Sequence, residues 1–395
     1  MQPPLRLPSP VPTNPNNAFA HHTMRVRVPG IVRDVARRNP DYSPNILDAL
    51  ERIAGDLESD APIPMLDTPA PDYDEWESLY APHRGETWLN SEWFFAEVYL
   101  YRLLIQAVRW WETGRDPFLP WKAEEMTSDN LWRTMEAALA TSSNTPEERL
   151  AELLLHVLWG NRIDLSLSIA ATHGTHAEED DLLVDDRSAA LRLFFQKSGS
   201  PSDTIHLIVD NAGSELAMDL ILAHTLIQMR VVERVVMHVK LHPTFVSDAT
   251  AHDVVFFMQL LEREGRSADL RRLGADLCEM FERGQLSLAP DAFWNSTNFL
   301  WQLPPRLQKT LDGGRLAIFK GDANYRRMTG DALWNPATPF SEVTAYFPIP
   351  LLALRTLKSD TIVGLPSGLA ERLEADDPQW RVNGKRGVIQ FSGGK

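Results

Sequence analysis

The first half of the chain carries apolar residues at the three-and-four spacing of amphipathic helices. The pattern is clearest in residues 45–57, 91–114 and 145–161. Side chains three or four positions apart share one face of a helix, so these segments are predicted to be helical. Strand-like alternation is scarce in this half. We therefore expect a helical region over residues 23–198.

The pattern changes after Pro201. Short apolar runs rich in β-branched residues occupy 204–210, 234–240 and 315–320, and helical patterns lie between them in 214–230, 249–265 and 268–284. Strands that alternate with helices predict a mainly parallel sheet flanked by helices, an α/β, Rossmann-like arrangement over residues 199–392. Ligands of such sheets bind at the carboxyl ends of the strands.

The first residues are rich in Pro, Asn and Ser and lack the apolar core of a secretory signal. We expect a flexible tail over residues 1–22. No apolar run approaches the ~20 residues that a membrane-spanning helix needs. These features favour a cytoplasmic protein without a membrane partner.

Composition narrows the range of partners. The chain has 395 residues, 44% of them hydrophobic, and a net charge of −15 that is spread along the sequence. An acidic surface repels nucleic-acid backbones and anionic lipids, so neither is expected as a partner.

The single cysteine, Cys278, excludes a disulfide framework and favours a buried apolar role. His238, His242 and His252 lack the paired spacing of a zinc site, so structural roles are expected.

Candidate chemistry begins where the run 204–210 ends. Asp210 and Asn211 follow this strand, and both side chains can ligate a hard cation. Glu215 and Asp219 are four positions apart on the next helix and share a face. The same residues would also suit an ordinary β–α turn with a helix cap, which the segment alone favours.

A second strand end carries similar groups. Lys320 ends the run 315–320, and Asp322 and Asn324 follow it. Together with Asp210 and Asn211, Asp322 would complete three oxygen ligands for one divalent ion.

Cationic groups accompany these carboxylates. Lys320 and a following arginine could hold phosphate oxygens. A third strand ends in Lys240, and Ser247 and Asp248 lie in the loop after it. Each group alone could be a surface charge, and spacing does not establish that they converge.

Several segments together resemble the damage-control phosphatases, in the branch described as acidic-residue methyltransferase-like proteins. The resemblance spans residues 18–391. Its most specific parts are FKGDANYRR (319–327) and LRTLKSD (354–360), supported by DNAGSELAMDL (210–220), HVKLHPTFVSDAT (238–250), AFAHHTMRVRVPGIV (18–32), SEWFFAEVYLYRLL (91–104) and LWGNRIDLSLS (158–168). Ser214 departs from the pattern, because a bulky apolar residue is expected there.

The resemblance implies an α/β domain with a helical region, one divalent metal ion (Mn, Mg, Co or Ni) and hydrolysis of small phosphate monoesters, chiefly sugar phosphates such as fructose phosphates. The implied metal ligands are Asp210, Asn211 and Asp322. The implied catalytic residues are Asp210, Glu215 and Lys358. The implied substrate-binding residues are Lys320, Asn324, Arg355, Lys240, Asp248, Glu97 and Asn161. Structural roles are the alternative for Glu97 and Arg102 and for Asn161 and Asp164, and the resemblance favours the site for the last two.

Phosphate monoesters repel nucleophiles, so a divalent ion must neutralise their oxygens. Lys358 and Lys320 would support the developing charge. The nucleophile is expected to be water, because a ligating Asp210 is less free to attack; a transiently phosphorylated aspartate is the alternative.

The rival function is an S-adenosylmethionine-dependent protein carboxyl methyltransferase, but the glycine-rich loop expected for it is missing. A non-catalytic binding protein is a third possibility. Substrate identity, the physiological metal and oligomeric state stay open.

Overall fold

The computed structural model describes residues 3, 5–140, 143, 145–160, 181–196 and 203–394. Asn161 and Asp164, two expected site residues, lie outside the described residues.

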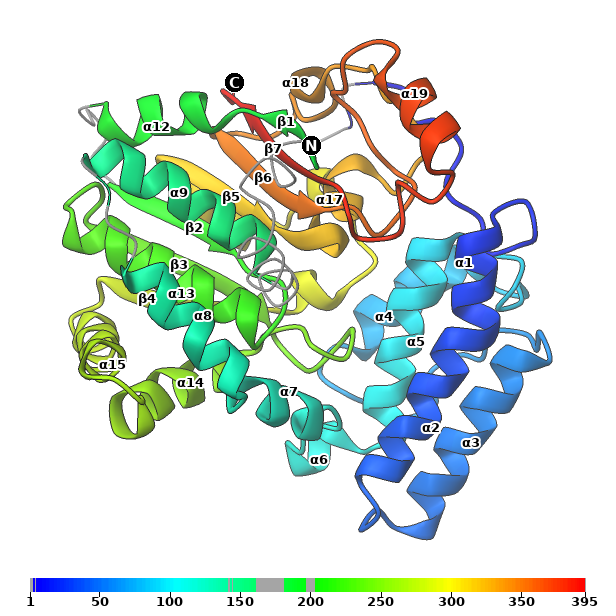
Figure 1. The fold of residues 1–395 in the computed structure, drawn as a ribbon. Coiled ribbons are helices and arrows are strands. Elements are labelled where there is room, and N and C mark those ends of the chain that lie inside the picture. The colour runs from blue at the N-terminus through cyan, green and yellow to red at the C-terminus, as the bar shows by residue number, and fades with distance from the viewer. Residues whose placement is uncertain are drawn as a thin grey trace.

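The N-terminal part is helical, as its periodicity predicts. Its helices are α1 (Ala18–His22), the π-helix η1 (Thr23–Arg27), α2 (Val28–Arg38), α3 (Pro44–Glu58), α4 (Tyr73–Tyr80), η2 (Ala81–His83), α5 (Trp93–Ala107), α6 (Trp110–Thr113), α7 (Leu119–Met126), α8 (Asp129–Ala140) and α9 (Pro146–Trp159). Helices α1 to α5 share one hydrophobic core and lie to one side of the sheet (Figure 1). Helices α8 and α9 instead belong to the core on one face of the sheet, where both pack against α13.

Seven strands form one sheet: β1 (Leu182–Asp185), β2 (Thr204–Ile208), β3 (Arg234–Lys240), β4 (Leu286–Asp291), β5 (Leu316–Lys320), β6 (Leu351–Thr356) and β7 (Gly387–Ser392). Their order is β1-β7-β6-β5-β2-β3-β4. All neighbours pair in parallel except β6 and β7. The predicted α/β class with a mainly parallel sheet is confirmed.

Helices cover both faces of this sheet. They are α12 (Arg187–Phe195), α13 (Ser214–Gln228), α14 (Ala251–Glu264), α15 (Ala268–Glu282), η3 (Ala292–Asn295), η4 (Leu300–Gln302), α16 (Pro305–Leu311), α17 (Gly321–Thr329), α18 (Phe340–Val343) and α19 (Leu369–Asp376). Alternation along β5 shows why two cores form: Leu316 and Ile318 belong to the core under α13, whereas Ala317 and Phe319 belong to the core on the opposite face.

The expected domain boundaries need two corrections. Strand β1 lies before residue 198 yet pairs with β7, so the sheet recruits chain from the expected helical region. The segment before residue 22 is not a free tail. Val11 is fully buried, Pro10 bridges to Ala332, Pro12 bridges to Glu92, and α1 already begins at Ala18. Burial against both parts outweighs the disorder that its composition suggests.

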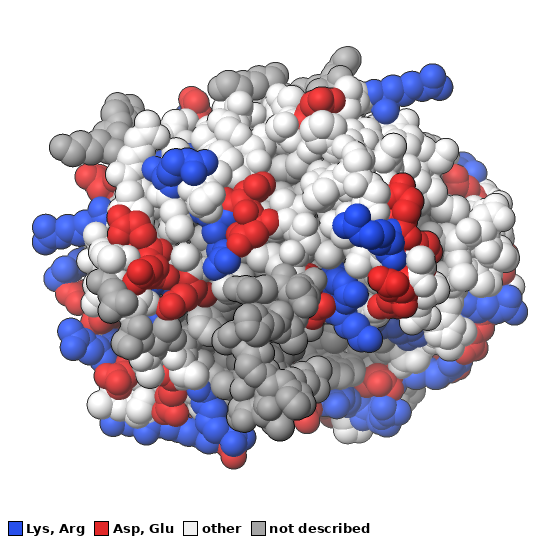
Figure 2. All heavy atoms as spheres, turned by 45° about the horizontal axis from the view of Figure 1, so that its top comes forward, with Lys and Arg blue, Asp and Glu red and all other residues white. Residues whose placement is uncertain are grey.

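Charged side chains of both signs are interspersed on the face shown in Figure 2. Within the part of the chain that the structure describes, no helix has the length and apolarity to cross a bilayer.

Candidate functional site

The carboxyl ends of β2, β5 and β6 meet the N-terminal helices at a cavity of about 210 Å³, called the cleft below. Its lining includes six of the predicted site residues: Glu97, Asp210, Asn211, Asp248, Asp322 and Lys358. The other lining residues are Phe19, Arg27, Trp93, Phe245, Ser247, Ala323 and Arg326. Segments more than 100 residues apart in sequence thus form one site.

Asp210 follows β2 and is buried. Its backbone carbonyl accepts a hydrogen bond from the Ala249 amide at 2.8 Å. Its Oδ1 has no hydrogen-bond partner among the described residues. Burial, with the nearby Asp248 and Glu215 carboxylates, raises the pKa of Asp210 well above its usual range. Lys240 and Lys358 only partly offset this shift, and no cation of the described residues pairs with the free oxygen.

The turn after β5 brings the second carboxylate against the first. Gly321 has φ +80°, and an added Cβ there would overlap Oδ2 of Asp210. Only glycine combines this left-handed conformation with so close an approach. Asp322 comes next and lies on the same cleft.

Asn211 joins three segments of the site. Its Nδ2 donates to Glu215 Oε1 at 2.8 Å and to Asp210 Oδ2 at 3.2 Å. Its Oδ1 accepts from Ser247 Oγ at 2.6 Å. The amide is therefore fixed in orientation, with its oxygen toward the loop that contains Ser247.

Asp322 is held firmly through one oxygen. Its Oδ1 accepts from Arg355 Nε at 2.8 Å, Ser359 Oγ at 3.1 Å and the Lys358 amide at 3.1 Å. Burial alone would raise the pKa of Asp322, but the Arg355 guanidinium and its neighbours hold it below its usual value. The buried Arg355 lies 4.2 Å from the ring centroid of Tyr325. Arg355 thus orients Asp322 and is absent from the cleft lining.

Two of the predicted lysines are buried in what we call the frame of the site, the residues that surround the cleft without lining it. Lys320 Nζ donates to the Val157 carbonyl at 2.9 Å and lies 3.3 Å from Asp219 and 3.7 Å from Glu215. Lys240 Nζ lies 3.3 Å from Asp248 Oδ2, with both side chains 2% exposed. Neither lysine lines the cleft. Each is the last residue of a strand, and its ammonium group pairs with buried carboxylates instead.

Asn324 also belongs to the frame. Its Nδ2 donates to the carbonyls of Val209 at 3.2 Å and Lys320 at 2.8 Å, which ties the ends of β2 and β5 together. Lys358 differs from these residues, because its side chain is exposed and lines the cleft.

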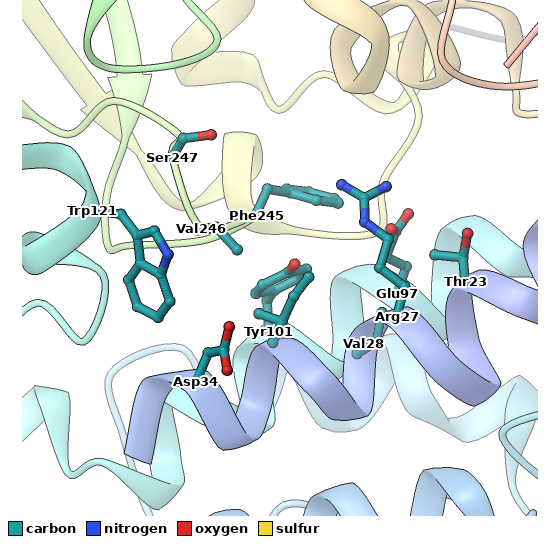
Figure 3. Close-up of a pocket in the computed structure, with 11 residues that line it drawn as sticks. Thr23, Arg27, Val28, Asp34, Glu97, Tyr101, Trp121, Phe245, Val246 and Ser247 are labelled. Atoms are coloured by element: carbon teal, nitrogen blue, oxygen red, sulfur yellow. The ribbon is translucent and has the colours of Figure 1, made fainter. Parts of the chain in front are cut away.

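Of the cleft residues on the N-terminal helices, sequence reasoning named Glu97 but missed Phe19, Arg27 and Trp93. Arg27 lies at the end of the π-helix η1 and reaches toward Phe245 on the opposite loop (Figure 3). Short π-helical insertions often mark functional positions. The segment 18–32 carried a family resemblance, but its periodicity gave no sign of a π-helix.

Arg326 was foreseen only as one of two adjacent arginines. It donates to Glu97 at 2.6 Å and to Asp331 at 2.9 and 3.0 Å, and its guanidinium lies 3.9 Å from the Trp93 ring centroid. Burial raises the pKa of Glu97, and the charge of Arg326 opposes that shift. This ion pair joins α17 to α5 across the two parts of the protein. Arg102, by contrast, is paired with Asp72 at 2.7 and 2.8 Å.

A second chamber of about 350 Å³ adjoins the cleft and shares Arg27, Glu97, Phe245 and Ser247 with it. Figure 3 shows its lining, which also includes Asp34 on α2, Tyr101 on α5 and Trp121 on α7.

The loop between these chambers has an unusual backbone. Phe245 has φ +48° and Val246 has φ +70°. The left-handed region is costly for a β-branched residue, so surrounding contacts must impose it. The conformation places Ser247 against Asn211, where the Ala212 amide also donates to the Ser247 carbonyl at 2.6 Å.

The donor set fits a hard divalent cation. Within the described residues no cluster of three or more His, Cys, Asp or Glu has metal-site geometry. The candidate set instead combines two carboxylates, Asp210 and Asp322, with the Asn211 amide. The unpartnered Oδ1 of Asp210 and the mutual repulsion of Asp210, Asp248 and Glu215 are features that a bound cation would relieve.

Comparisons with known proteins show which family the chain belongs to. Residues 23–373 match the model of the damage-control phosphatase ARMT1-like domain. Curated relatives called "Damage-control phosphatase ARMT1" are 30% identical in Danio rerio, 29% in Xenopus laevis and 28% in Homo sapiens; each alignment covers 95% of this chain and 95–96% of the relative. A crystal structure of a DUF89 family protein from Pyrococcus horikoshii aligns with a TM-score of 0.47 and 16% identity over 91% of this chain and 95% of that chain. The chain belongs to the damage-control phosphatase ARMT1-like family.

Proposed function

We propose that this chain is a metal-dependent phosphatase that hydrolyses small phosphate monoesters, chiefly sugar phosphates such as fructose phosphates, in the cytoplasm. One observation carries the proposal: Asp210, Asn211 and Asp322 line the same cleft as the exposed cations Lys358 and Arg27. Oxygen donors beside free cations suit a phosphate group better than they suit the sulfonium group of a methyl donor.

Asp210, Asn211 and Asp322 would hold one divalent ion, Mn, Mg, Co or Ni. When bound, such an ion supplies neutralisation of phosphate oxygens and lowers the pKa of water. Carboxylate and amide oxygens favour Mg or Mn among these metals.

The side chains of the protein account for the remaining steps. Lys358 and Arg27 bind phosphate oxygens and stabilise the charge that develops on them. Asp322 presents its free oxygen in a fixed direction, because Arg355 and Ser359 hold the other one. Asp210 as a metal ligand is less free to attack phosphorus, so water is the proposed nucleophile.

The adjoining chamber accepts the organic part of the substrate. Thr23, Asp34 and Ser247 offer hydrogen bonds to hydroxyl groups, and Tyr101 and Trp121 offer ring faces. Polar groups interspersed with aromatic rings suit a sugar better than an acyl chain or a polyanion.

Phosphate release from a panel of sugar phosphates, with and without Mn²⁺, Mg²⁺, Co²⁺, Ni²⁺ or chelator, tests the function. We expect metal-stimulated release that chelator abolishes. Asp322→Asn, which keeps an acceptor for Arg355, should lose activity by on the order of a hundredfold or more and should lose metal-induced thermal stabilisation. Intact metal-dependent activity in Asp322→Asn would refute the metal site. Methyl transfer from S-adenosylmethionine without phosphatase activity in the wild type would refute the function.

A further inference from the structure

Helix α7 contacts the starts of α13 and α14, which directly follow two of the loops that line the cleft. It lies between the N-terminal helices and the α/β part of the protein (Figure 1). Lys122 and Glu125 are three positions apart and thus share one face of α7. Neither residue lines the cleft, and the metal-binding and catalytic roles proposed above do not use them.

Glu125 fixes the first loop. Its Oε1 accepts a hydrogen bond from the backbone N–H of Ser214 at 2.8 Å, at the first turn of α13. Gly213 has φ +75°, and an added Cβ would overlap the Glu125 carboxylate. A carboxylate at a helix start is stabilised by the helix dipole and by the free N–H groups there. The turn held in this way, residues 210–213, contains Asp210 and Asn211.

Lys122 fixes the second loop. It is buried, and its Nζ donates to Asp253 Oδ2 at 2.8 Å and to Asp116 Oδ2 at 2.9 Å. Asp253 in turn caps α14, because its Oδ2 accepts from the amide and the hydroxyl of Thr250, both at 2.8 Å. The residues just before this cap form the loop with Ser247 and Asp248.

We propose that α7 is a clamp that sets the distance between the two loops of the active site, with Glu125 and Lys122 as its positioning residues. This inference rests on the proposed function. Asn211 and Ser247 face each other across the two loops at 2.6 Å, so a shift of either loop disturbs the donor set. Helix N-termini commonly bind anions such as phosphate. Because the Glu125 carboxylate already occupies the N-terminus of α13, the substrate phosphate cannot bind at that position.

The test compares Glu125→Ala, Glu125→Asp and Glu125→Gln in the full-length protein. Removing or shortening the side chain should lower kcat and Mn²⁺ affinity by about 10- to 100-fold, as supporting residues around metal sites typically do. KM should change little, because Glu125 touches no substrate. Glu125→Gln should keep most activity, since its amide oxygen still accepts from Ser214. Glu124→Ala is the matched control, because Glu124 is the adjacent, exposed residue paired with Arg38 on the surface.

Amide hydrogen exchange provides a readout independent of turnover. Peptides covering residues 210–216 should exchange faster in Glu125→Ala and Glu125→Asp than in Glu125→Gln or Glu124→Ala. A folded Glu125→Asp with wild-type kcat, Mn²⁺ affinity and exchange would overturn the clamp, even if Glu125→Ala does not fold. A wild type that releases no phosphate would instead overturn the proposed function, while Mn²⁺ binding and exchange would still decide the role of α7.

Discussion

At the scale of single residues, the lysines of the site differ more than their sequence contexts suggest. Lys240 and Lys320 both end buried strands and both pair with buried carboxylates. Lys358 follows β6 in a loop, its side chain is exposed, and only its backbone amide contacts Asp322. Of these three lysines, Lys358 alone has an ammonium group without a hydrogen bond or ion pair to the described residues.

Lys358→Ala should lower turnover while leaving the fold and metal binding nearly intact, because the backbone amide that holds Asp322 remains. Loss of one group that stabilises developing charge typically costs about 10²- to 10³-fold in kcat. Steady-state kinetics, metal titration and thermal unfolding measure the three properties. Lys309→Ala removes one exposed positive charge from α16 and serves as the control. Wild-type kinetics in a folded Lys358→Ala would remove Lys358 from the mechanism.

At the scale of elements, the two turns that carry the proposed metal ligands depend on glycine. Gly321 begins α17 and lets Asp210 approach the backbone of the second turn. The close approach brings Asp210 and Asp322 to one cavity although 112 positions of sequence separate them. The turns after the neighbouring strands β2 and β5 therefore depend on each other for the positions of Asp210 and Asp322.

Gly321→Ala should impair metal binding and turnover strongly, because the new Cβ would displace the Asp210 carboxylate. Gly284→Ala is the matched control: Gly284 has φ +70°, but an added Cβ there meets no atom within 4 Å. The control isolates the cost of the left-handed backbone, about 1 kcal/mol. Metal affinity and the free energy of unfolding should fall much further in Gly321→Ala. Equal effects of the two substitutions would show that the contact with Asp210 is unimportant.

At the scale of the whole molecule, the sheet buries a histidine pair that links stability to pH. His206 on β2 and His238 on β3 are 3.1 Å apart between Nδ1 and Nε2. Burial lowers the pKa of His206 to about 4, and burial with the neighbouring ring lowers the pKa of His238 to about 3. Both rings are therefore neutral in the folded protein at pH 5 to 7.

The folded state should lose stability from this pair as the pH falls below the unfolded-state pKa of about 6.5. Between pH 6.5 and about pH 4, the two histidines bind protons in the unfolded chain but stay neutral in the folded protein. The free energy of unfolding therefore decreases as the pH falls through this range. Between pH 7 and 5 the loss is about 2 kcal/mol for each histidine. Denaturant unfolding of the wild type and of a His206→Gln, His238→Gln double variant measures it. The double variant should show a flatter pH dependence, whereas the exposed His252→Gln should not. Parallel profiles for all three proteins would contradict the neutral buried pair.

The sequence by itself determined the α/β class, three of the seven described strands (β2, β3 and β5) with the helices α13, α14 and α15, and the presence of Asp210, Asn211 and Asp322 at strand ends. Period-two and helical patterns are local consequences of burial, and strand ends of a parallel sheet meet at one edge, so these features are readable without a structure. The resemblance of the segment 354–360 added Lys358.

Only the tertiary structure decided which of these groups line the cleft. Arg355 and Lys320 carry charge as Lys358 does, yet contacts from distant segments, the Asp322 carboxylate and the Val157 carbonyl, hold them in the frame. Arg27 enters the cleft because the N-terminal helices pack against the strand ends, a contact that no local periodicity encodes. Charge placement inside a protein is set by three-dimensional neighbours that compensate burial, and those neighbours lie far apart in the chain.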